Sequence, residues 1–229
     1  VAFKLAAALD GCTPDEMLPF YGDLAAIGTI ADIMLLEGEN RRIVKAGLAL
    51  LQQTERPGIA ALIEACGLGG KELTAENVSF GLAPRLNAAG RMDSAAAALE
   101  LLLCEDPEEA EAIVAGLEAQ NAARQKAEQD ILQGVLDSVA ADETYGADRI
   151  LVVWGRGYHQ GVIGIVASRV VERFGKPAII VSVDENGEGK GSGRSIAGVS
   201  LYNAIAACGD LLIRFGGHAL AAGLSVREE

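Results

Sequence analysis

The sequence has few aromatic residues, few cysteines and no long apolar run, and each scarcity excludes a class of protein. Only 4% of the 229 residues are aromatic while half are hydrophobic, so the core must consist largely of small aliphatic side chains. That is enough apolar material for one large domain or two small ones, which excludes a disordered chain. No apolar run approaches the ~20 residues of a membrane helix, so we expect no membrane span.

The cysteines are scattered and include no C-x-x-C pair: Cys12, Cys66, Cys104 and Cys208. Structural zinc sites and thioredoxin-like redox motifs need closely spaced cysteines, so both are disfavoured. Buried, reduced thiols in a cytoplasmic protein are the simplest interpretation. The first residues contain neither a secretion signal nor a starting methionine, and we expect the chain to be a piece of a longer protein.

Basic residues are also scarce. Nineteen Lys and Arg against 32 Asp and Glu give a formal net charge of −13. This is the wrong sign for a protein that holds nucleic acid by bulk electrostatic attraction. Any polyanionic ligand must therefore be bound by a local cluster of donors.

The first half of the chain has a helical pattern that ends in one long helix. Residues 1–105 carry apolar residues at helical spacing, interrupted by Pro and Gly. Residues 106–109, Asp-Pro-Glu-Glu, have the capping Asp, early Pro and acidic first turn of a helix start. No Pro follows before about Ala141, and the segment is too polar to be buried all round. We therefore predict one helix from about residue 106 to about Ala141, which connects two lobes.

After Gly146 the pattern becomes α/β. Two apolar runs, 149–154 and 178–183, predict buried strands on either side of a helix at 162–174. The later elements expected are an edge strand at 189–194, a helix at Leu201–Cys208 and a closing strand at Ala222–Val226.

Residues 155–161, Gly-Arg-Gly-Tyr-His-Gln-Gly, lie between a predicted strand and a predicted helix. The amino end of a helix attracts phosphate, and glycines allow close approach. The segment nearly matches the dinucleotide fingerprint, and Asp184 follows the next strand at a suitable distance. However, the third glycine is misplaced and position 160 is Gln, so a nicotinamide cofactor is disfavoured.

Residues 189–195, Gly-Lys-Gly-Ser-Gly-Arg-Ser, alternate glycine with a hydroxyl and two cations. In a strand this alternation puts the side chains on one face and leaves the backbone accessible. Ser192 and Arg194 could then meet a phosphate oxygen with a hydroxyl and a planar fork. The alternative is a flexible hairpin.

Both histidines of the chain lie beside glycines in predicted loops. His159 belongs to the segment just described, and His218 to Phe-Gly-Gly-His-Ala at 215–219. Flanking glycines favour a backbone held open for a ligand over a buried core histidine.

Two further candidates lie in the first half. The segment Pro84–Met92, which contains Asn87 and Arg91, has the composition of a tight polar turn that suits an anion, or of a salt-bridged linker. Asp32 is a single carboxylate in a long apolar run, which is costly unless it is paired, hydrogen-bonded or metal-bound. A helix-capping or ion-paired Asp is the alternative there.

Together these segments resemble the single-stranded-DNA-specific 5′→3′ exonucleases of the DHH phosphoesterase superfamily. The matching stretches, in the family order, are Leu24–Asp32, Phe80–Met92, Gly157–Ala167, Gly191–Ser195 and Phe215–Leu224. The resemblance implies an α/β protein in three parts. Residues 1–105 would be the helical C-terminal part of a DHH domain, 106–146 a connecting helix and 147–229 a small α/β DHHA1 domain.

The resemblance also implies the chemistry. Enzymes of this family hydrolyse phosphodiester bonds with two Mn²⁺ or Mg²⁺ ions held by aspartates and histidines of four motifs. Asp32 matches the last of these motifs, which makes it the candidate catalytic and metal-binding residue. The other ligands would precede Val1, so we expect this chain by itself to be inactive and to bind these ions weakly.

The remaining site residues are expected to contact DNA or its phosphates: Asn87, Arg91, His159, Ser192, Arg194 and His218. The expected partner is single-stranded DNA, in recombination and repair, and no membrane is involved. Two alternatives stay open. One is a DHH-type phosphodiesterase acting on short oligonucleotides or cyclic dinucleotides, and the other is a non-catalytic nucleic-acid-binding module.

Overall fold

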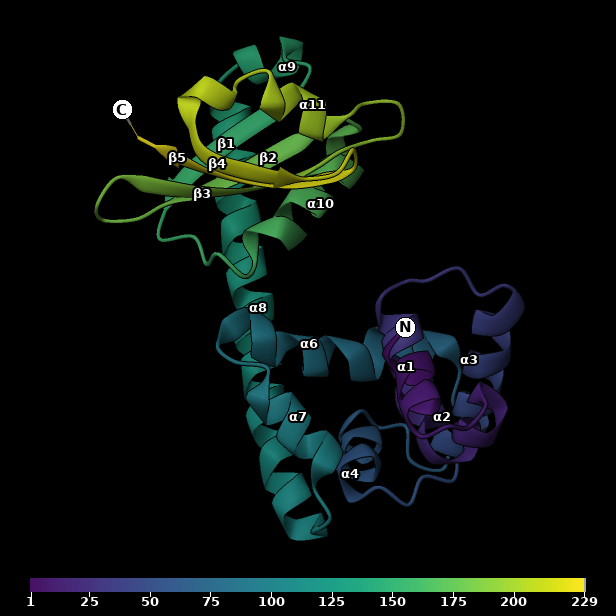
Figure 1. Ribbon diagram of the computed structural model, residues 1–229. Helices are drawn as coiled ribbons and strands as arrows, with labels where there is room; N and C mark the ends of the chain where they lie inside the picture. The colour runs from purple at the N-terminus through teal and green to yellow at the C-terminus, as the bar shows by residue number, and fades with distance from the viewer. Residues whose placement is uncertain (229) are drawn as a thin grey trace. The chain divides into compact units, whose positions relative to one another are not determined.

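The computed structural model describes residues 1–228, and the chain divides into two compact units, Val1–Asn121 and Ala122–Glu229 (Figure 1). The first unit is helical. The second combines helices with a five-stranded sheet. The predicted α/β fold class is therefore confirmed.

The first unit is built from helices around a core of aliphatic side chains. In chain order they are α1 (Ala2–Leu9), α2 (Pro14–Ala31), α3 (Gly38–Leu51), α4 (Pro57–Ala65), α5 (Ala75–Asn77), the π-helical η1 (Val78–Leu82), α6 (Ala83–Met92) and α7 (Ala96–Leu103). Glycine allows the close approach between helices α2 and α3. A Cβ on Gly47 of α3 would lie 2.3 Å from the Gly22 carbonyl oxygen of α2, so only glycine lets these helices pack this tightly.

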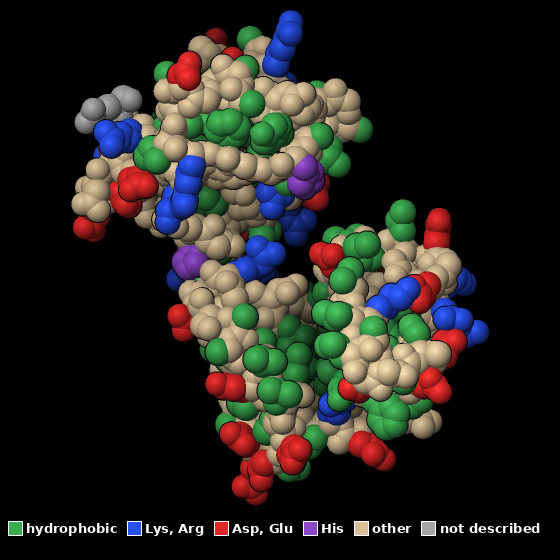
Figure 2. All heavy atoms as spheres, viewed as in Figure 1, with side chains coloured by type: hydrophobic (Ala, Val, Ile, Leu, Met, Phe, Trp, Pro, Cys, Tyr) green, Lys and Arg blue, Asp and Glu red, His purple; other side chains and the backbone are tan. Residues whose placement is uncertain are grey.

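The long helix α8 (Pro107–Ala141) has 35 residues and begins and ends where the sequence predicts. The Asp106 carboxylate accepts a hydrogen bond from the backbone N–H of Glu109 at 2.9 Å, so Asp106 caps the helix. Val114 and Leu117 are buried in the first unit. Figure 2 shows acidic side chains gathered around the start of this helix.

The prediction of a tight turn at Pro84–Met92 is wrong, because this segment is helix α6. Proline has no N–H, so Pro84 cannot make the usual bond to the carbonyl four residues earlier. Just before Pro84 the helix widens into a π-helical turn, in which the N–H of Ala83 donates to the carbonyl of Val78. Single π-helical turns occur frequently at functional sites.

The sheet of the second unit has the strand order β1-β2-β3-β5-β4. After α8, the second unit contains, in chain order, α9 (Thr144–Ala147), β1 (Leu151–Arg156), α10 (Ile163–Phe174), β2 (Ala178–Val183), β3 (Glu188–Arg194), α11 (Leu201–Ala206), the 3-10 turn η2 (Gly209–Leu211), β4 (Leu212–Gly217) and β5 (Ala221–Arg227). Strands β1 and β2 are parallel and joined through α10, while the other pairs are antiparallel.

Two expectations about this sheet are wrong. The glycine-rich segment forms β3 in the middle of the sheet and not at its edge, and the expected closing strand, β5, is also an interior strand. The edge strands are β1 and β4, and the sequence predicts a loop over residues of β4.

The glycines of β3 do not leave its backbone accessible. Gly189, Gly191 and Gly193 are buried, and a Cβ on any of them would come within 2.6 to 2.9 Å of Val226, Leu224 or Leu201. Glycine is needed here because the core side chains on the α11 side press directly on the strand. The side chains between the glycines do share one face, as the alternation predicts.

Within residues 1–228 no helix combines the length and the hydropathy that a membrane-spanning segment needs.

Candidate nucleic-acid interface

Ser192 and Arg194 lie on the same face of β3 and contact each other. The Arg194 guanidinium donates to the Ser192 hydroxyl oxygen at 3.2 Å and to the Gly193 carbonyl at 2.9 Å. Both side chains are half-buried. A guanidinium and a hydroxyl held together in this way form the donor pair expected for a phosphate oxygen.

Gly164, in the first turn of α10, brings a helix amino end against this pair. A Cβ on Gly164 would lie 2.9 Å from the Ser192 hydroxyl oxygen and 3.0 Å from a guanidinium nitrogen of Arg194. The amino end of a helix carries a partial positive charge that favours an anion, although several N–H groups of this turn already donate to backbone carbonyls. A hydroxyl, a guanidinium and the positive end of a helix dipole therefore meet at one place.

Each histidine is held by one ring nitrogen. Nδ1 of His159 accepts from the Gly161 N–H at 3.2 Å, and Nδ1 of His218 accepts from the Leu220 N–H at 3.3 Å. In the neutral ring the proton is then on Nε2, which can donate to a ligand. Both residues lie in loops, as predicted, the first half-buried and the second exposed.

The sheet register places the histidines near opposite ends of β3. The Ser182 hydroxyl donates to the carbonyl of Tyr158, the neighbour of His159, and Ser182 pairs with Lys190. His218 donates its backbone N–H to Ala221, which pairs with Arg194. Lys190 and Arg194 are four residue steps apart along the strand, about 13 Å. The histidines thus flank Ser192 and do not meet.

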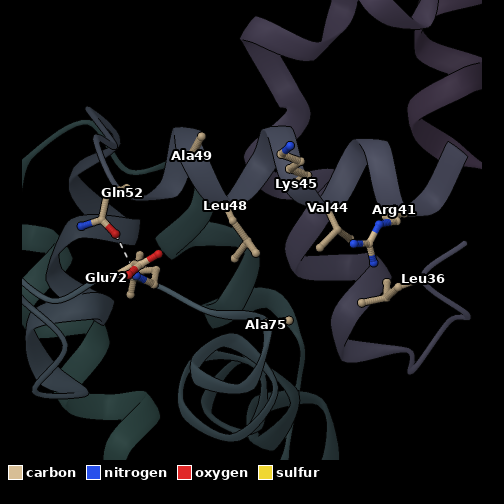
Figure 3. A pocket seen from close by; sticks show the side chains of 10 residues that line it. Leu36, Arg41, Val44, Lys45, Leu48, Ala49, Gln52, Glu72 and Ala75 are labelled. Atoms are coloured by element: carbon tan, nitrogen blue, oxygen red, sulfur yellow. Dashed lines mark hydrogen bonds between the residues drawn. The ribbon is translucent and has the colours of Figure 1, made fainter. Parts of the chain in front are cut away.

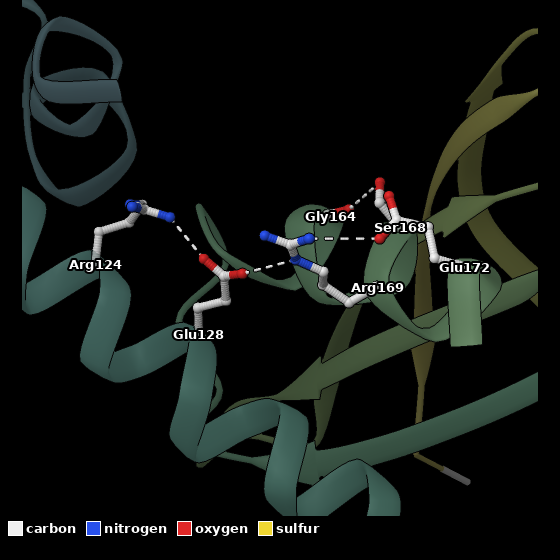
Figure 4. Close-up of polar contacts among 6 residues, drawn as sticks. All are labelled: Arg124, Glu128, Gly164, Ser168, Arg169 and Glu172. Atoms are coloured by element: carbon white, nitrogen blue, oxygen red, sulfur yellow. Dashed lines mark hydrogen bonds and ion pairs between the residues drawn. The ribbon is translucent and has the colours of Figure 1, made fainter. Parts of the chain in front are cut away.

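A charged network fixes α10 within the second unit (Figure 4). Glu128 of α8 accepts from Arg124 at 2.6 Å and from Arg169 of α10 at 3.2 Å. The hydrogen bond to Glu128 raises the pKa of Arg169 above its ordinary value. This contact holds the helix that carries Gly164.

Tyr158 is a positioning residue that sequence reasoning missed. Its ring fills the space above Gly155, where a Cβ would lie 2.3 Å from the ring, and its hydroxyl approaches Gly134 of α8. Burial raises the pKa of the Tyr158 hydroxyl. The ring thereby anchors the loop that leads to His159. Two glycines distant in sequence make room for it, a relationship visible only in the fold.

In the first unit, Asn87 and Arg91 lie one turn apart on α6, and both are exposed. Arg85, on the same helix, is largely buried and paired with the Glu118 carboxylate, and it also donates to the Gly81 carbonyl at 2.9 Å. Arg85 therefore stabilises the unit, while Asn87 and Arg91 face solvent.

Asp32 is exposed, so its carboxylate does not carry the cost of burial that an apolar run would impose. It is the C-terminal capping residue of α2, where the apolar face of that helix ends. Among residues 1–228 no three His, Cys, Asp or Glu side chains gather where they could hold a metal ion. The side chains present therefore do not fit a two-metal centre, and no catalytic step can be assigned to metal ions held here.

A separate hollow of about 450 Å³ lies against α3 in the first unit (Figure 3). Leu36, Val44 and Leu48 line it, with Arg41 and Lys45 beside them. None of the residues predicted from the sequence to form the site belongs to it.

Comparison with known proteins shows which domain family the second half of the chain matches. Residues 147–229 match the family model for the DHHA1 domain. Ser192, Arg194 and Gly164 thus lie within the residues that this model matches.

The particular relatives are RecJ proteins. The whole chain is 46% identical over 231 residues to the "Single-stranded-DNA-specific exonuclease RecJ" of Bacillus subtilis (strain 168), and covers 28% of that protein. The RecJ of Thermus thermophilus is 43% identical over 91% of this chain and 29% of its own length. The crystal structure of a Thermus thermophilus RecJ in complex with Mg²⁺ has a TM-score of 0.84 at 40% identity, over 97% of this chain and 33% of that chain. A second structure, with Mn²⁺, also gives 0.84.

The chain is therefore similar over its whole length to part of the RecJ exonucleases. It spans about a third of the length of the relatives it matches.

Proposed function

We propose that this chain is part of a divalent-metal-dependent exonuclease that removes nucleotides 5′→3′ from single-stranded DNA in recombination and repair in the cytoplasm. Relatives that carry the single-stranded-DNA-specific exonuclease name align with the whole chain at up to 46% identity. Related structures hold Mg²⁺ or Mn²⁺. Asp32 would supply one ligand of such a centre in the complete protein.

Within that enzyme, the proposed task of this chain is to bind the DNA. We assign residues 1–105 to the C-terminal part of a DHH domain, 106–146 to the connecting helix and 147–229 to the DHHA1 domain. Asn87, Arg91, His159 and His218 would contact the strand.

The observation that carries the proposal is the meeting of Ser192, Arg194 and the Gly164 turn of α10. The site is small and half-buried, and it combines a hydroxyl with a planar fork, so it suits a terminal phosphate group. An exonuclease that starts from a 5′ end needs such a site, because binding the terminal phosphate fixes how far the strand enters. Local donors would also allow a chain whose net charge is −13 to bind an anion.

The test compares 5′-phosphorylated and 5′-hydroxyl single strands of one sequence, by binding to this chain and by hydrolysis in the complete protein with Mn²⁺. A hydrogen bond to a charged group contributes about 1.5–3 kcal/mol. Arg194→Ala should therefore reduce the preference for the 5′-phosphate by about tenfold or more. Arg194→Lys should restore only part of it, because a point charge cannot replace a planar fork.

Arg173, exposed in the last turn of α10, provides the control, since Arg173→Ala removes the same charge. An unchanged preference in Arg194→Ala would refute the phosphate assignment. Faster hydrolysis of cyclic dinucleotides than of single-stranded DNA by the complete protein would favour the small-nucleotide phosphodiesterase instead.

A further inference from the structure

Beyond the terminal phosphate, we propose that Lys190 and Arg214 form a second set of phosphate contacts. They would guide the backbone of a single strand across the α10 face of the sheet. This inference rests on the proposed function, since it assigns the path that the strand takes after its terminal phosphate is bound.

The sheet register puts these two cations in one row. Lys190 of β3 pairs with Ser225 of β5, and Ser225 pairs with Arg214 of β4. Residues directly opposite each other in antiparallel strands point to the same face. The Arg214 side chain confirms this by donating to the Ser225 hydroxyl at 3.3 Å. Two strand spacings separate the cations, about 10 Å.

A β-bulge places Arg214 in this row. The register shifts between Leu212, which pairs with Val226, and Arg214, which pairs with Ser225. Ile213 is the extra residue. With regular alternation Arg214 would share the face of Leu212, which packs into the core with α11. The bulge turns the guanidinium to the α10 face, and bulges that redirect a side chain are common beside functional sites.

The row of cations lies next to the proposed terminal-phosphate site, which is formed by Ser192 and Arg194. Ser192 lies two residues from Lys190 on the same face of β3, a step of about 7 Å. Its neighbours across the sheet are Gly223 of β5 and Gly216 of β4. Ser192 and the glycines thus form a second row parallel to the first.

The two glycines leave this part of the sheet open. Gly216 and Gly223 are exposed, and a Cβ on Gly216 would meet nothing within 4 Å. These glycines therefore differ from those of β3, which make room for core side chains. Helix α10 contacts β2 and β3, so the sheet beyond β3 has a bare backbone surface flanked by cations.

The charges favour an anionic chain over other occupants. Lys190 and Arg214 are both exposed, and neither forms an ion pair within residues 1–228. The opposite face of β4 is different, because the Phe215 ring packs there at a tilt against Tyr202 of α11, with ring centroids 5.9 Å apart. Figure 2 shows hydrophobic side chains gathered in this region of the second unit. Cations with a flat backbone floor between them fit a phosphodiester backbone, whose successive charges need successive donors.

The experiment measures the affinity of this chain for a 5′-phosphorylated mononucleotide and for a 5′-phosphorylated single strand of about a dozen nucleotides, over a range of salt concentrations. The double variant Lys190→Ala/Arg214→Ala should bind the long strand about tenfold more weakly at low salt and leave mononucleotide binding unchanged. Each phosphate contact contributes ~0.7 to the slope of log K against log salt for single strands, so the slope should fall by about 1.4. Arg149→Ala/Arg173→Ala removes two exposed arginines of the same unit and is the matched control.

A second variant changes no charge. Gly216→Val puts a branched side chain where the structure has open space, and valine suits a strand. It should weaken binding of the long strand and spare the mononucleotide, with the thermal midpoint maintained.

The outcomes separate the two proposals. If the double variant loses affinity for the long strand and keeps the preference for a 5′-phosphate, the result supports Lys190 and Arg214 as contacts for the strand. If wild type shows no 5′-phosphate preference but the double variant still loses long-strand affinity, the terminal site fails and the row stands. Equal losses in the double variant and the arginine control, or an equal loss for a polyglutamate of matched charge, would overturn the row as a DNA path.

Discussion

Asp32 and Ile33 form a strained end to α2. Asp32 is the exposed C-terminal cap of the helix, and Ile33 directly after it is the one non-glycine residue with a positive φ, 53°, within residues 1–228. A β-branched residue in the left-handed region is disfavoured. An acidic side chain at a helix carboxyl end also opposes the helix dipole. Neither residue therefore serves the stability of this unit, which is consistent with a functional role for Asp32.

Relieving the backbone strain at Ile33 should increase the stability of the first unit. Ile33→Gly should raise the free energy of unfolding by about 1 kcal/mol, because glycine adopts a positive φ without steric cost and Ile33 is largely exposed, so little burial is lost. Asp32→Asn should be neutral or slightly stabilising. Urea denaturation measures both. A loss of stability in Ile33→Gly would show that the Ile33 side chain contributes packing that outweighs the strain.

Gly164→Ala tests the close approach of α10 to β3. Alanine would favour the helix by about 1 kcal/mol, yet its Cβ must displace the Ser192 hydroxyl or the Arg194 guanidinium. We expect the preference for a 5′-phosphate to fall by about tenfold while the thermal midpoint changes little. Gly116→Ala in α8, where a Cβ would meet open space, is the control. An unaltered preference would mean that the pair binds no phosphate at this turn.

Residues 1–228 should hold divalent metal ions only weakly, because no cluster of metal-ligating side chains is found among them. Titration calorimetry of this chain with Mn²⁺ or Mg²⁺ should show no tight site, because one exposed carboxylate cannot hold two ions against water. The chain should accordingly show no exonuclease activity. In the complete protein, Asp32→Ala should abolish turnover with little change in stability. Tight binding that Asp32→Ala removes from this chain would show that other ligands are present here.

The elements predicted correctly are those whose signals are local. The capping Asp106 and the absence of proline set the bounds of α8, and the apolar run at β2 defines a strand buried on both faces. The alternation of glycine with Lys190, Ser192 and Arg194 sets which side chains share a face. Each of these features follows from chain geometry over a few residues, so the order of amino acids is enough to reveal it.

What the sequence could not reveal depends on contacts between distant segments. Pro84 indicates a turn until the π-helical turn before it is known, and β4 has almost no buried side chains, so only its pairing with β5 makes it a strand. The buried glycines of β3, the place of Gly164 against Ser192 and the bulge that turns Arg214 toward Lys190 are likewise decided by which surfaces meet. The order of amino acids predicts most of the helices, the apolar strands and the residue types proposed to bind phosphate. Where these residues come together depends on the packing of distant segments, because two backbones approach closely only where a glycine leaves out the side chain.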